Sequence, residues 1–301
     1  MSAYHTPVLL NESVSALDIK TDGVYVDATF GGGGHSREIL SRLSSKGRLL
    51  AFDQDEEAIA NAPDDERLIM VHSNFRFIHN FVRYHGFYGV DGILADLGVS
   101  SHQFDTSERG FSFRFDEAPL DMRMNRSVKR TAEDIVNSYS EGDLEGIFRL
   151  YGEIDGSRKL AQLIVAGRSI SPIRTAGDLG RAIESVLPKF ARHKYLAKVY
   201  QALRMEVNGE MDALGNFLAG ATKALKSGGR FAVITYHSLE DRMVKNYFKA
   251  GNITGESGHD LMGTLPSPYL PVIKKPILPS EEEISSNTRA RSAKLRVAEK
   301  R

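Results

Sequence analysis

The chain has 301 residues, 41% of them hydrophobic and 26% charged, which predicts a soluble globular protein of one large or two smaller domains. Its 39 basic and 39 acidic residues cancel, which excludes binding to nucleic acid through net charge alone. The sequence has no cysteine, no signal-peptide pattern and no apolar run of eighteen residues, so we expect a cytoplasmic protein without disulfides or membrane segments.

The first hundred residues alternate between strand-like and helix-like patterns. Strand candidates span residues 23–30, 48–53, 67–72 and 92–97. Helical patterns lie between them at 36–43, 55–62 and 75–84. This alternation predicts right-handed βαβ units and a parallel sheet that is covered on both faces.

A glycine cluster follows the first strand, in Asp27-Ala-Thr-Phe-Gly-Gly-Gly-Gly-His-Ser36, and Asp53 ends the second strand. Three interpretations are open: a turn without a ligand, a dinucleotide site, or an S-adenosylmethionine site. The dinucleotide pattern fails because Ser36 occupies its third glycine position, and no Walker lysine follows. Asp27 and Asp53 suit the ammonium and the ribose of S-adenosylmethionine, which we therefore favour as the cofactor.

Two further residues stand where other strands end. Asp96 ends the fourth strand and could approach the methionine amino group or the adenine amine of the cofactor. Its alternative role is that of a turn or capping residue. Phe75 follows the third strand and could stack on adenine, although a single Phe in such a place is more often part of a core.

The alternation stops near Phe104, and no convincing strand appears before Glu206. Helical patterns occupy residues 131–138, 143–150, 157–168, 176–185 and 194–205. Thr131 and Thr175 are predicted N-caps. We therefore expect an inserted all-helical domain at residues 104–206, with residues 1–103 and 207–301 forming the α/β domain.

The α/β pattern resumes after the insert. A helix is predicted over residues 210–225 with Gly228-Gly229 as its C-cap, followed by a strand at 230–236 and a helix at 239–249. Residues 251–279 are predicted to form a loop, and a last strand is predicted within 292–299.

Seven motifs occur in order along nearly the whole chain: His5-Thr-Pro-Val-Leu-Leu-Asn-Glu12, Asp27 to Ser36 as quoted above, Asp91-Gly-Ile-Leu-Ala-Asp-Leu-Gly-Val-Ser-Ser101, Asp121-Met-Arg-Met124, Asn208-Gly-Glu-Met-Asp212, Tyr236-His-Ser-Leu-Glu-Asp-Arg242 and Arg291-Ser-Ala-Lys-Leu-Arg296. Together they resemble the bacterial ribosomal RNA small-subunit methyltransferase H family. The resemblance implies an α/β fold: a class I, Rossmann-like methyltransferase domain with a mostly parallel sheet and an inserted all-helical domain. It also implies methylation of N4 of cytosine 1402 in 16S rRNA with S-adenosylmethionine.

The resemblance further implies a set of cofactor contacts: Gly33, Gly34, His35, Asp53, Phe75, Asp96 and Gln103. The nine histidines lack metal-ligand spacing, so we expect no metal site.

The reaction needs an acceptor for hydrogens of the cytosine amine, and a proton must leave during or after transfer. Asp121, Asp96 and His237 are the catalytic candidates. Asp121 would accept from the amine, although a salt bridge with Arg123 is the alternative. His237 would hold the base or relay the proton, or would simply cap the helix that starts near Leu239.

The target base must be unpaired before reaction, so aromatic stacking and phosphate contacts are expected. The candidate RNA contacts are Arg109, Phe113, Arg123, Arg126 and Arg130. The aromatic residues could equally form a small core under their loop. We expect the assembled small subunit as substrate, and apolar faces on the insert would permit a homodimer. The alternatives are a class I methyltransferase acting on DNA or a small molecule, and a non-catalytic ribosome-assembly factor.

Overall fold

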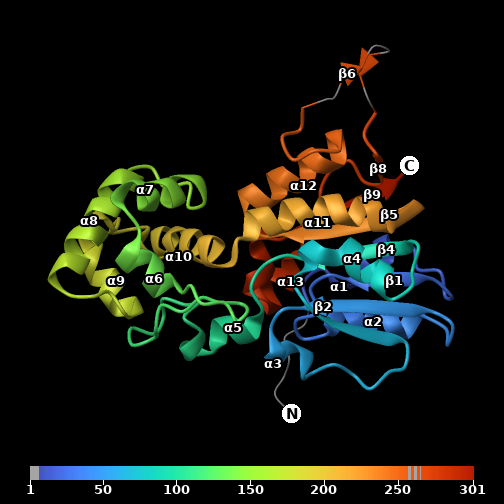
Figure 1. Cartoon of the computed structure of the whole chain (residues 1–301), viewed down its shortest axis with the longest axis horizontal. Helices are drawn as coiled ribbons and strands as arrows, with labels where there is room; N and C mark the ends of the chain where they lie inside the picture. The colour runs from blue at the N-terminus through green and yellow to red at the C-terminus, as the bar shows by residue number, and fades with distance from the viewer. Residues whose placement is uncertain (1–6, 257–258, 261–262, 265) are drawn as a thin grey trace. The chain divides into compact units, whose positions relative to one another are not determined.

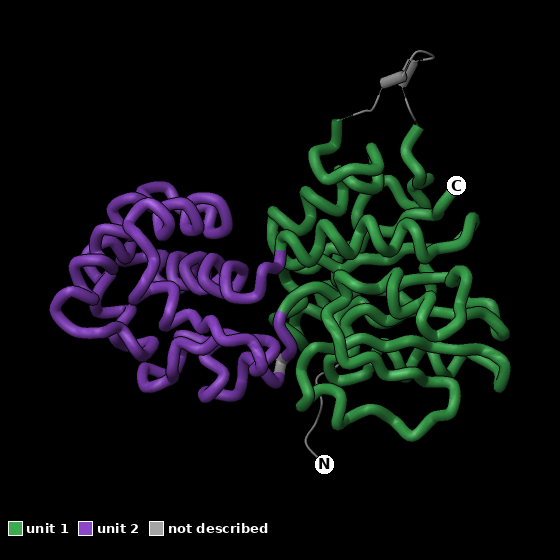
Figure 2. Tube along the Cα trace, in the orientation of Figure 1, with its two compact units in different colours: residues 1–98, 211–301 green, residues 99–210 purple. Residues whose placement is uncertain are grey.

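The computed structural model describes residues 7–256, 259–260, 263–264 and 266–301, so the first two residues of the His5 motif lie outside the described part. The chain divides into two compact units, which Figure 2 colours separately: residues 1–98 with 211–301, and residues 99–210. These boundaries lie within a few residues of those expected from the sequence. We call them the α/β unit and the helical unit.

The α/β unit is built on a seven-stranded sheet in the order β3-β2-β1-β4-β5-β9-β8. The strands are β1 (Val24–Asp27), β2 (Arg48–Asp53), β3 (Leu68–His72), β4 (Val90–Asp96), β5 (Leu225–Thr235), β8 (Tyr269–Pro271) and β9 (Lys294–Lys300). The first five are parallel, and β9 runs antiparallel to β5 and β8. This confirms the predicted α/β class with a mostly parallel sheet. The strand order reverses between β1 and β4, the point at which such sheets bind ligands beyond their carboxyl ends.

Helices cover both faces of this sheet (Figure 1). Neighbouring residues of a buried strand point to opposite faces. Tyr25 therefore packs in one core with α1 (Leu10–Ala16) and α2 (Gly34–Arg42). Val26 packs in the other core, with helices of the opposite face. Those helices are α4 (Ile78–Tyr84), α11 (Glu210–Ala224) and α12 (Ser238–Ala250). The shorter elements are α3 (Glu56–Ile59), η1 (Phe75–Phe77), β6 (His259–Asp260), β7 (Gly263–Thr264), α13 (Glu281–Ser286) and η4 (Thr288–Ser292).

The junction of α11 and β5 differs from the prediction. Gly228 and Gly229 do not cap α11, because that helix ends at Ala224 and β5 begins at the next residue. The pairing of β4 with β5 shifts register between Val90 and Gly92, which pair with residues 225 and 230. The extra residues bulge out at Gly228, whose φ is +74°. The predicted C-cap is therefore wrong, and the glycines serve an irregular strand.

Helices make up the regular structure of the second unit as far as residues 99–210 are described. They are α5 (Ser101–Asp105), η2 (Ser107–Arg109), α6 (Ala132–Ser138), α7 (Glu141–Leu150), α8 (Ser157–Ile170), α9 (Ala176–Ala182), η3 (Glu184–Val186) and α10 (Arg192–Asn208). The predicted N-caps are confirmed, since Thr131 and Thr175 each form a capping box with an Asp three residues later. The unit has its own core, with Leu144, Phe148 and Leu203 fully buried.

Candidate functional site

The glycine loop connects β1 to α2 and is tied to the neighbouring strand. Phe30 donates a 2.8 Å backbone hydrogen bond to the Phe52 carbonyl, and Gly33 donates one of 2.7 Å to the Phe30 carbonyl. Gly33 is the N-cap of α2 with φ +75°, and a Cβ there would lie 2.6 Å from the Phe30 ring. A Cβ on Gly34 would lie 2.0 Å from Pro7. Both predicted cofactor glycines are thus required by the loop's own packing.

Gly31 differs from the other glycines of the loop. Its φ is +52°, a left-handed conformation, but a Cβ there would meet only the Thr29 carbonyl, at 4.0 Å. The space beside Gly31 is therefore free for a ligand, at the end of the sheet where the strand order reverses.

Asp27 lies beneath the loop and is completely buried. Its carboxylate accepts hydrogen bonds from Ser36 Oγ at 2.6 Å and from the Thr29 amide at 3.1 Å. Burial raises the pKa of Asp27, and these two hydrogen bonds oppose that shift. Asp27 therefore locks both ends of the loop in place, and its burial removes it from the ammonium-binding role suggested by the sequence.

Asp53 ends β2 and is half-buried. One carboxylate oxygen accepts from the Gly31 amide at 2.8 Å, and the other accepts from the Asp55 amide at 2.9 Å. Burial raises the pKa of Asp53 to about 6, against the lowering effect of these hydrogen bonds. The predicted ribose acceptor thus also fixes the position of the glycine loop.

Asp96 ends β4 and is held by two hydrogen bonds. Its amide donates to Thr29 Oγ1 at 2.7 Å, and its Oδ1 accepts from the Tyr236 hydroxyl at 2.7 Å. His35 Nδ1 lies 3.9 Å from Asp96 Oδ2, beyond hydrogen-bond distance. Burial raises the pKa of Asp96 to about 6, while His35 and Tyr236 lower it.

His35 is buried at the start of α2, and its Nε2 lies 3.2 Å from the Val8 carbonyl. Burial lowers the pKa of His35, more than the Asp96 carboxylate raises it. A neutral ring that donates from Nε2 to Val8 leaves Nδ1 as an acceptor facing Asp96. Two acceptors then lie 3.9 Å apart, which favours a ligand that carries N–H donors.

These residues fit S-adenosylmethionine. That molecule carries an ammonium, a sulfonium and ribose hydroxyls. Asp53 and Asp96 present carboxylates at the ends of β2 and β4, and the side chain of Asp96 retains 23% exposure. The open space at Gly31 lies at the end of β1, between those two strands. The charges and the free backbone surface match a cation with a ribose, and the loop has no lysine of a phosphate site.

Phe75 begins η1 after β3 and packs edge to face on Phe217, with ring centroids 5.0 Å apart. It remains partly exposed beside the core of that sheet face. The packing accounts for an aromatic residue at this position, and adenine stacking stays a prediction.

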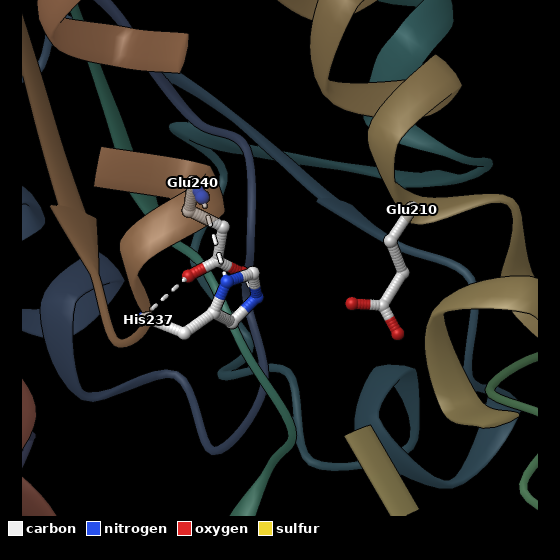
Figure 3. Close-up of side chains that lie close together, drawn as sticks. All are labelled: Glu210, His237 and Glu240. Carbon is white, nitrogen blue, oxygen red and sulfur yellow. Dashed lines mark hydrogen bonds and ion pairs between the residues drawn. The ribbon is translucent and has the colours of Figure 1, made fainter. Parts of the chain in front are cut away.

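His237 and Glu240 occupy the first turn of α12 (Figure 3). His237 Nδ1 accepts from the Glu240 amide at 3.4 Å, and Glu240 Oε2 accepts from the Tyr236 amide at 2.9 Å. His237 Nε2 lies 3.0 Å from Glu240 Oε1 without hydrogen-bond geometry. The structure thus gives His237 its alternative role as a helix cap. Figure 3 also labels Glu210, the first residue of α11, whose carboxylate accepts two hydrogen bonds of 2.8 Å from Arg204.

Gln103, the last of the predicted cofactor contacts, belongs to the helical unit. It is buried in a capping box, in which its amide donates to Ser100 Oγ at 3.2 Å and its Oε1 accepts from the Ser100 amide at 3.3 Å. Its side chain therefore fixes the start of α5.

Asp121 and Arg123 form the salt bridge that the sequence left as an alternative. Arg123 Nε and Nη2 each donate to Asp121 at 2.8 Å, and the Arg123 amide donates at 3.0 Å. Burial raises the pKa of Asp121, but the Arg123 hydrogen bonds outweigh it and hold the pKa below its usual range. Met122 between them has φ +59°, a strained conformation for a non-glycine residue. The pair therefore holds a tight, strained turn.

Arg109 and Phe113 lie against the interior of the helical unit. Arg109 is only 1% exposed, and its guanidinium donates to the carbonyls of Arg123 and Met124 at 3.1 and 3.2 Å. A side chain so buried cannot reach a phosphate, so the predicted RNA contact of Arg109 is wrong. Phe113 packs on Tyr200 with centroids 5.3 Å apart, which favours the core alternative.

Arg126 and Arg130 are exposed, as an RNA contact requires. Arg130 donates to the Tyr139 hydroxyl at 2.8 Å and lies over that ring. Their contact with RNA stays a prediction.

Tyr236 and Thr29 hold Asp96, and Glu240 holds the start of α12, which the sequence analysis does not predict. Tyr236 follows β5, the neighbour of β4, so the strand order of a doubly wound sheet could have placed it beside Asp96. Nothing in the sequence pattern marks Thr29.

Among the described residues, no helix is both long and apolar enough to cross a membrane.

Comparison with known proteins identifies the chain's relatives. The model of the MraW methylase family matches residues 2–301. The ribosomal RNA small subunit methyltransferase H of Bacteroides fragilis is 58% identical over 300 residues, covering 100% of this chain and 98% of that protein. The protein of the same name from Flavobacterium johnsoniae is 55% identical over 297 residues, covering 99% and 98%.

Two solved structures share much lower sequence identity with the chain. TrmN from Thermus thermophilus has a TM-score of 0.43 at 14% identity, covering 97% of this chain and 48% of that one. A putative rRNA methylase from Clostridium thermocellum has a TM-score of 0.41 at 13% identity, covering 99% and 100%. The full-length family match and the identity to its relatives settle the membership: the chain belongs to the MraW methylase family.

Proposed function

We propose that this chain methylates N4 of cytosine 1402 in 16S rRNA of the small ribosomal subunit. The observation that carries the proposal is the 58% identity, over the full length, to a protein named ribosomal RNA small subunit methyltransferase H. The chain is an S-adenosylmethionine-dependent methyltransferase, and the base and its position come from the family resemblance.

The bound cofactor supplies a methyl group already activated by its sulfonium. A bond forms between N4 and the methyl carbon, the carbon–sulfur bond breaks with its electron pair left on sulfur, and N4 loses a proton. The residues of the site must therefore align the amine with the methyl group and accept its hydrogens.

Within the α/β unit, we assign cofactor binding to the glycine loop and the carboxylates around it. Asp53 accepts from the ribose, and Asp96 with His35 Nδ1 accepts from the ammonium. Two observations support this assignment: the free space at Gly31, and the 3.9 Å distance between Asp96 Oδ2 and His35 Nδ1. Gly33 and Gly34 shape the loop, and Phe75 completes the proposed set within this unit. Gln103 belongs to the helical unit, and its contact with the cofactor stays a prediction.

For the amine hydrogens we propose Asp121 as the acceptor. Its low pKa keeps it ionised, which suits a carboxylate that polarises the N–H bond but makes it a weak base. Asp121 therefore localises the amine lone pair, and the proton leaves to solvent or to another group. His237 is the second candidate proposed for that group, and its Nε2 lies 3.0 Å from the Glu240 carboxylate.

The helical unit is proposed to bind the substrate RNA through exposed cations, including Arg126 and Arg130.

The assembled small subunit is the proposed substrate, because one base within a folded site implies recognition of shape. The proposed substrate implies a cytoplasmic enzyme, because small subunits are assembled in the cytoplasm. A homodimer remains an expectation, to be tested by the mass of the protein in solution.

The test is methyl transfer from labelled cofactor to small subunits that lack the modification, followed by mapping of the labelled nucleotide. Label on N4 of cytosine 1402 is expected. Label on another nucleotide, on DNA or on a small molecule would contradict the proposal. Binding to subunits without any transfer would favour the assembly-factor alternative.

A further inference from the structure

One exposed aromatic side chain has no role in the site described above. Phe190 lies in the short loop between η3 and α10 of the helical unit. It is 104% exposed, more than any other large hydrophobic side chain in the described part of the chain. A fully exposed phenyl ring contributes nothing to the stability of the fold, so its function has to be inferred from the residues around it.

The loop that carries Phe190 is anchored at both ends. Leu187 before it and Tyr195 after it pack against the core of the helical unit. The Ala191 amide donates to the Pro188 carbonyl at 3.2 Å, and the Tyr195 amide donates to the Ala191 carbonyl at 2.9 Å. The ring is therefore presented on a fixed turn, which limits the entropy lost when a partner binds it.

The charged residues that flank Phe190 in the sequence are all basic. No Asp or Glu occurs between Glu184 and Glu206, in a protein whose net charge is zero. Lys189 and Lys194 are exposed on either side of the ring. Arg192 is also exposed and pairs with Glu184 at 2.6 Å. An aromatic ring between cations complements a polyanion that also offers flat rings.

We propose that Phe190 stacks on an unpaired base of the substrate RNA, while Lys189 and Lys194 bind the phosphates beside that base. This base is distinct from the reacting cytosine. The inference rests on the proposed function for the identity of the RNA, and it assigns Phe190 to substrate binding and not to methyl transfer. Stacking of this kind is tolerant of sequence, so the contact supplies affinity for an exposed strand.

Four variants test the role of the ring. Phe190→Ala removes it, Phe190→Leu keeps apolar bulk without a flat face, and Phe190→Trp keeps a stacking surface. Ile170→Ala is the matched control, because Ile170 is 89% exposed in the same unit but has serines on both sides. The residues are exposed, so each variant should melt within a few degrees of the wild type.

The measurement is KM for small subunits lacking the modification, alongside kcat and the cofactor Kd. Phe190→Ala and Phe190→Leu should each raise KM about tenfold, with kcat and cofactor Kd unchanged. Phe190→Trp and Ile170→Ala should behave as wild type. A wild-type KM for Phe190→Ala overturns the proposal. A wild-type KM for Phe190→Leu also overturns it, because it indicates an apolar pocket on a protein.

A photo-crosslinking residue in place of Phe190 gives a second, independent readout. A crosslink to an rRNA nucleotide is expected, and a crosslink confined to a ribosomal protein overturns the stacking contact. Failure of the proposed function is distinguishable, because it appears as wild-type enzyme that labels no subunit RNA. Direct binding of wild type and variants to 16S rRNA then still decides the role of Phe190.

Discussion

The Tyr236 hydroxyl donates a 2.7 Å hydrogen bond to Asp96 Oδ1 and so joins the end of β5 to the end of β4. It occupies one oxygen of the carboxylate and leaves Oδ2 facing His35 Nδ1 across 3.9 Å. Burial favours the neutral form of Asp96, and the Tyr236 hydrogen bond opposes that effect. Tyr236 is therefore a positioning residue for the carboxylate proposed to bind the cofactor ammonium.

Replacement of Tyr236 by Phe should weaken cofactor binding about tenfold at pH 7, because a hydrogen bond to a charged group is lost. Titration calorimetry with S-adenosylmethionine measures this directly. Tyr247→Phe is the matched control, since that buried hydroxyl contacts Thr222 in the opposite core and should leave the Kd unchanged. An unaltered Kd for Tyr236→Phe would remove Tyr236 from the site.

Cofactor affinity should depend on pH through Asp53 and Asp96, whose pKa values are both raised to about 6. As pH falls through 6, both carboxylates take up a proton and lose their attraction for the ammonium and ribose. The Kd should therefore rise several-fold between pH 7 and pH 5. Asp96→Asn should bind weakly at every pH and show a shallower dependence, whereas a flat wild-type profile would contradict the assignment.

The stability of the unliganded protein should depend on pH in the opposite direction to cofactor affinity, because it should increase as pH falls. A carboxyl whose pKa is raised in the folded state contributes stability below about pH 4 and loses it as pH rises through 6. Asp96→Asn removes this loss, so its melting temperature relative to wild type should increase between pH 4 and pH 7. Roughly 1–3 kcal/mol is expected from a shift of about two pKa units, measured by thermal unfolding across that range.

The sequence predicted the sheet more fully than the site. Strand–helix alternation was sufficient for the parallel order, because buried strands and amphipathic helices carry distinct periodicities. The role of Gly228 as a C-cap was predicted wrongly, because a glycine pair after a helix looks the same in sequence whether it caps that helix or forms a bulge in the next strand. Arg109 was misassigned because sequence does not distinguish a buried guanidinium bonded to carbonyls from an exposed one. The Tyr236–Asp96 bond joins residues 140 apart and depends on strand order.

Substitution of Asp121 can distinguish a catalytic role of this residue from a purely structural one. If it accepts from the cytosine amine, Asp121→Asn should lower kcat at least a hundredfold with cofactor Kd unchanged, because the charged acceptor is lost but the shape is kept. Single-turnover methyl transfer to small subunits measures this.

Arg123→Lys is the matched control for Asp121. It keeps a cation but breaks the bidentate pairing with both 2.8 Å hydrogen bonds. If the pair only holds the turn at Met122, both variants should lower the melting temperature and alter kcat to a similar, small extent. Wild-type turnover in Asp121→Asn would exclude the catalytic role.

The glycines of the loop should divide into two classes. Gly33→Ala places a Cβ 2.6 Å from the Phe30 ring in a left-handed conformation, so it should destabilise the fold by about 2 kcal/mol through overpacking and strain. Gly31→Ala meets no such obstacle, and its strain of about 1 kcal/mol should be accompanied by a larger loss of cofactor affinity. Gly146→Ala, inside α7 with no neighbour within 4 Å of the new Cβ, should stabilise the protein slightly. Thermal unfolding and cofactor titration of the three variants distinguish these outcomes.

If Gly31→Ala binds the cofactor as wild type does, the open space at Gly31 is not part of the site, and the cofactor must approach the loop from Asp53 and Asp96 alone.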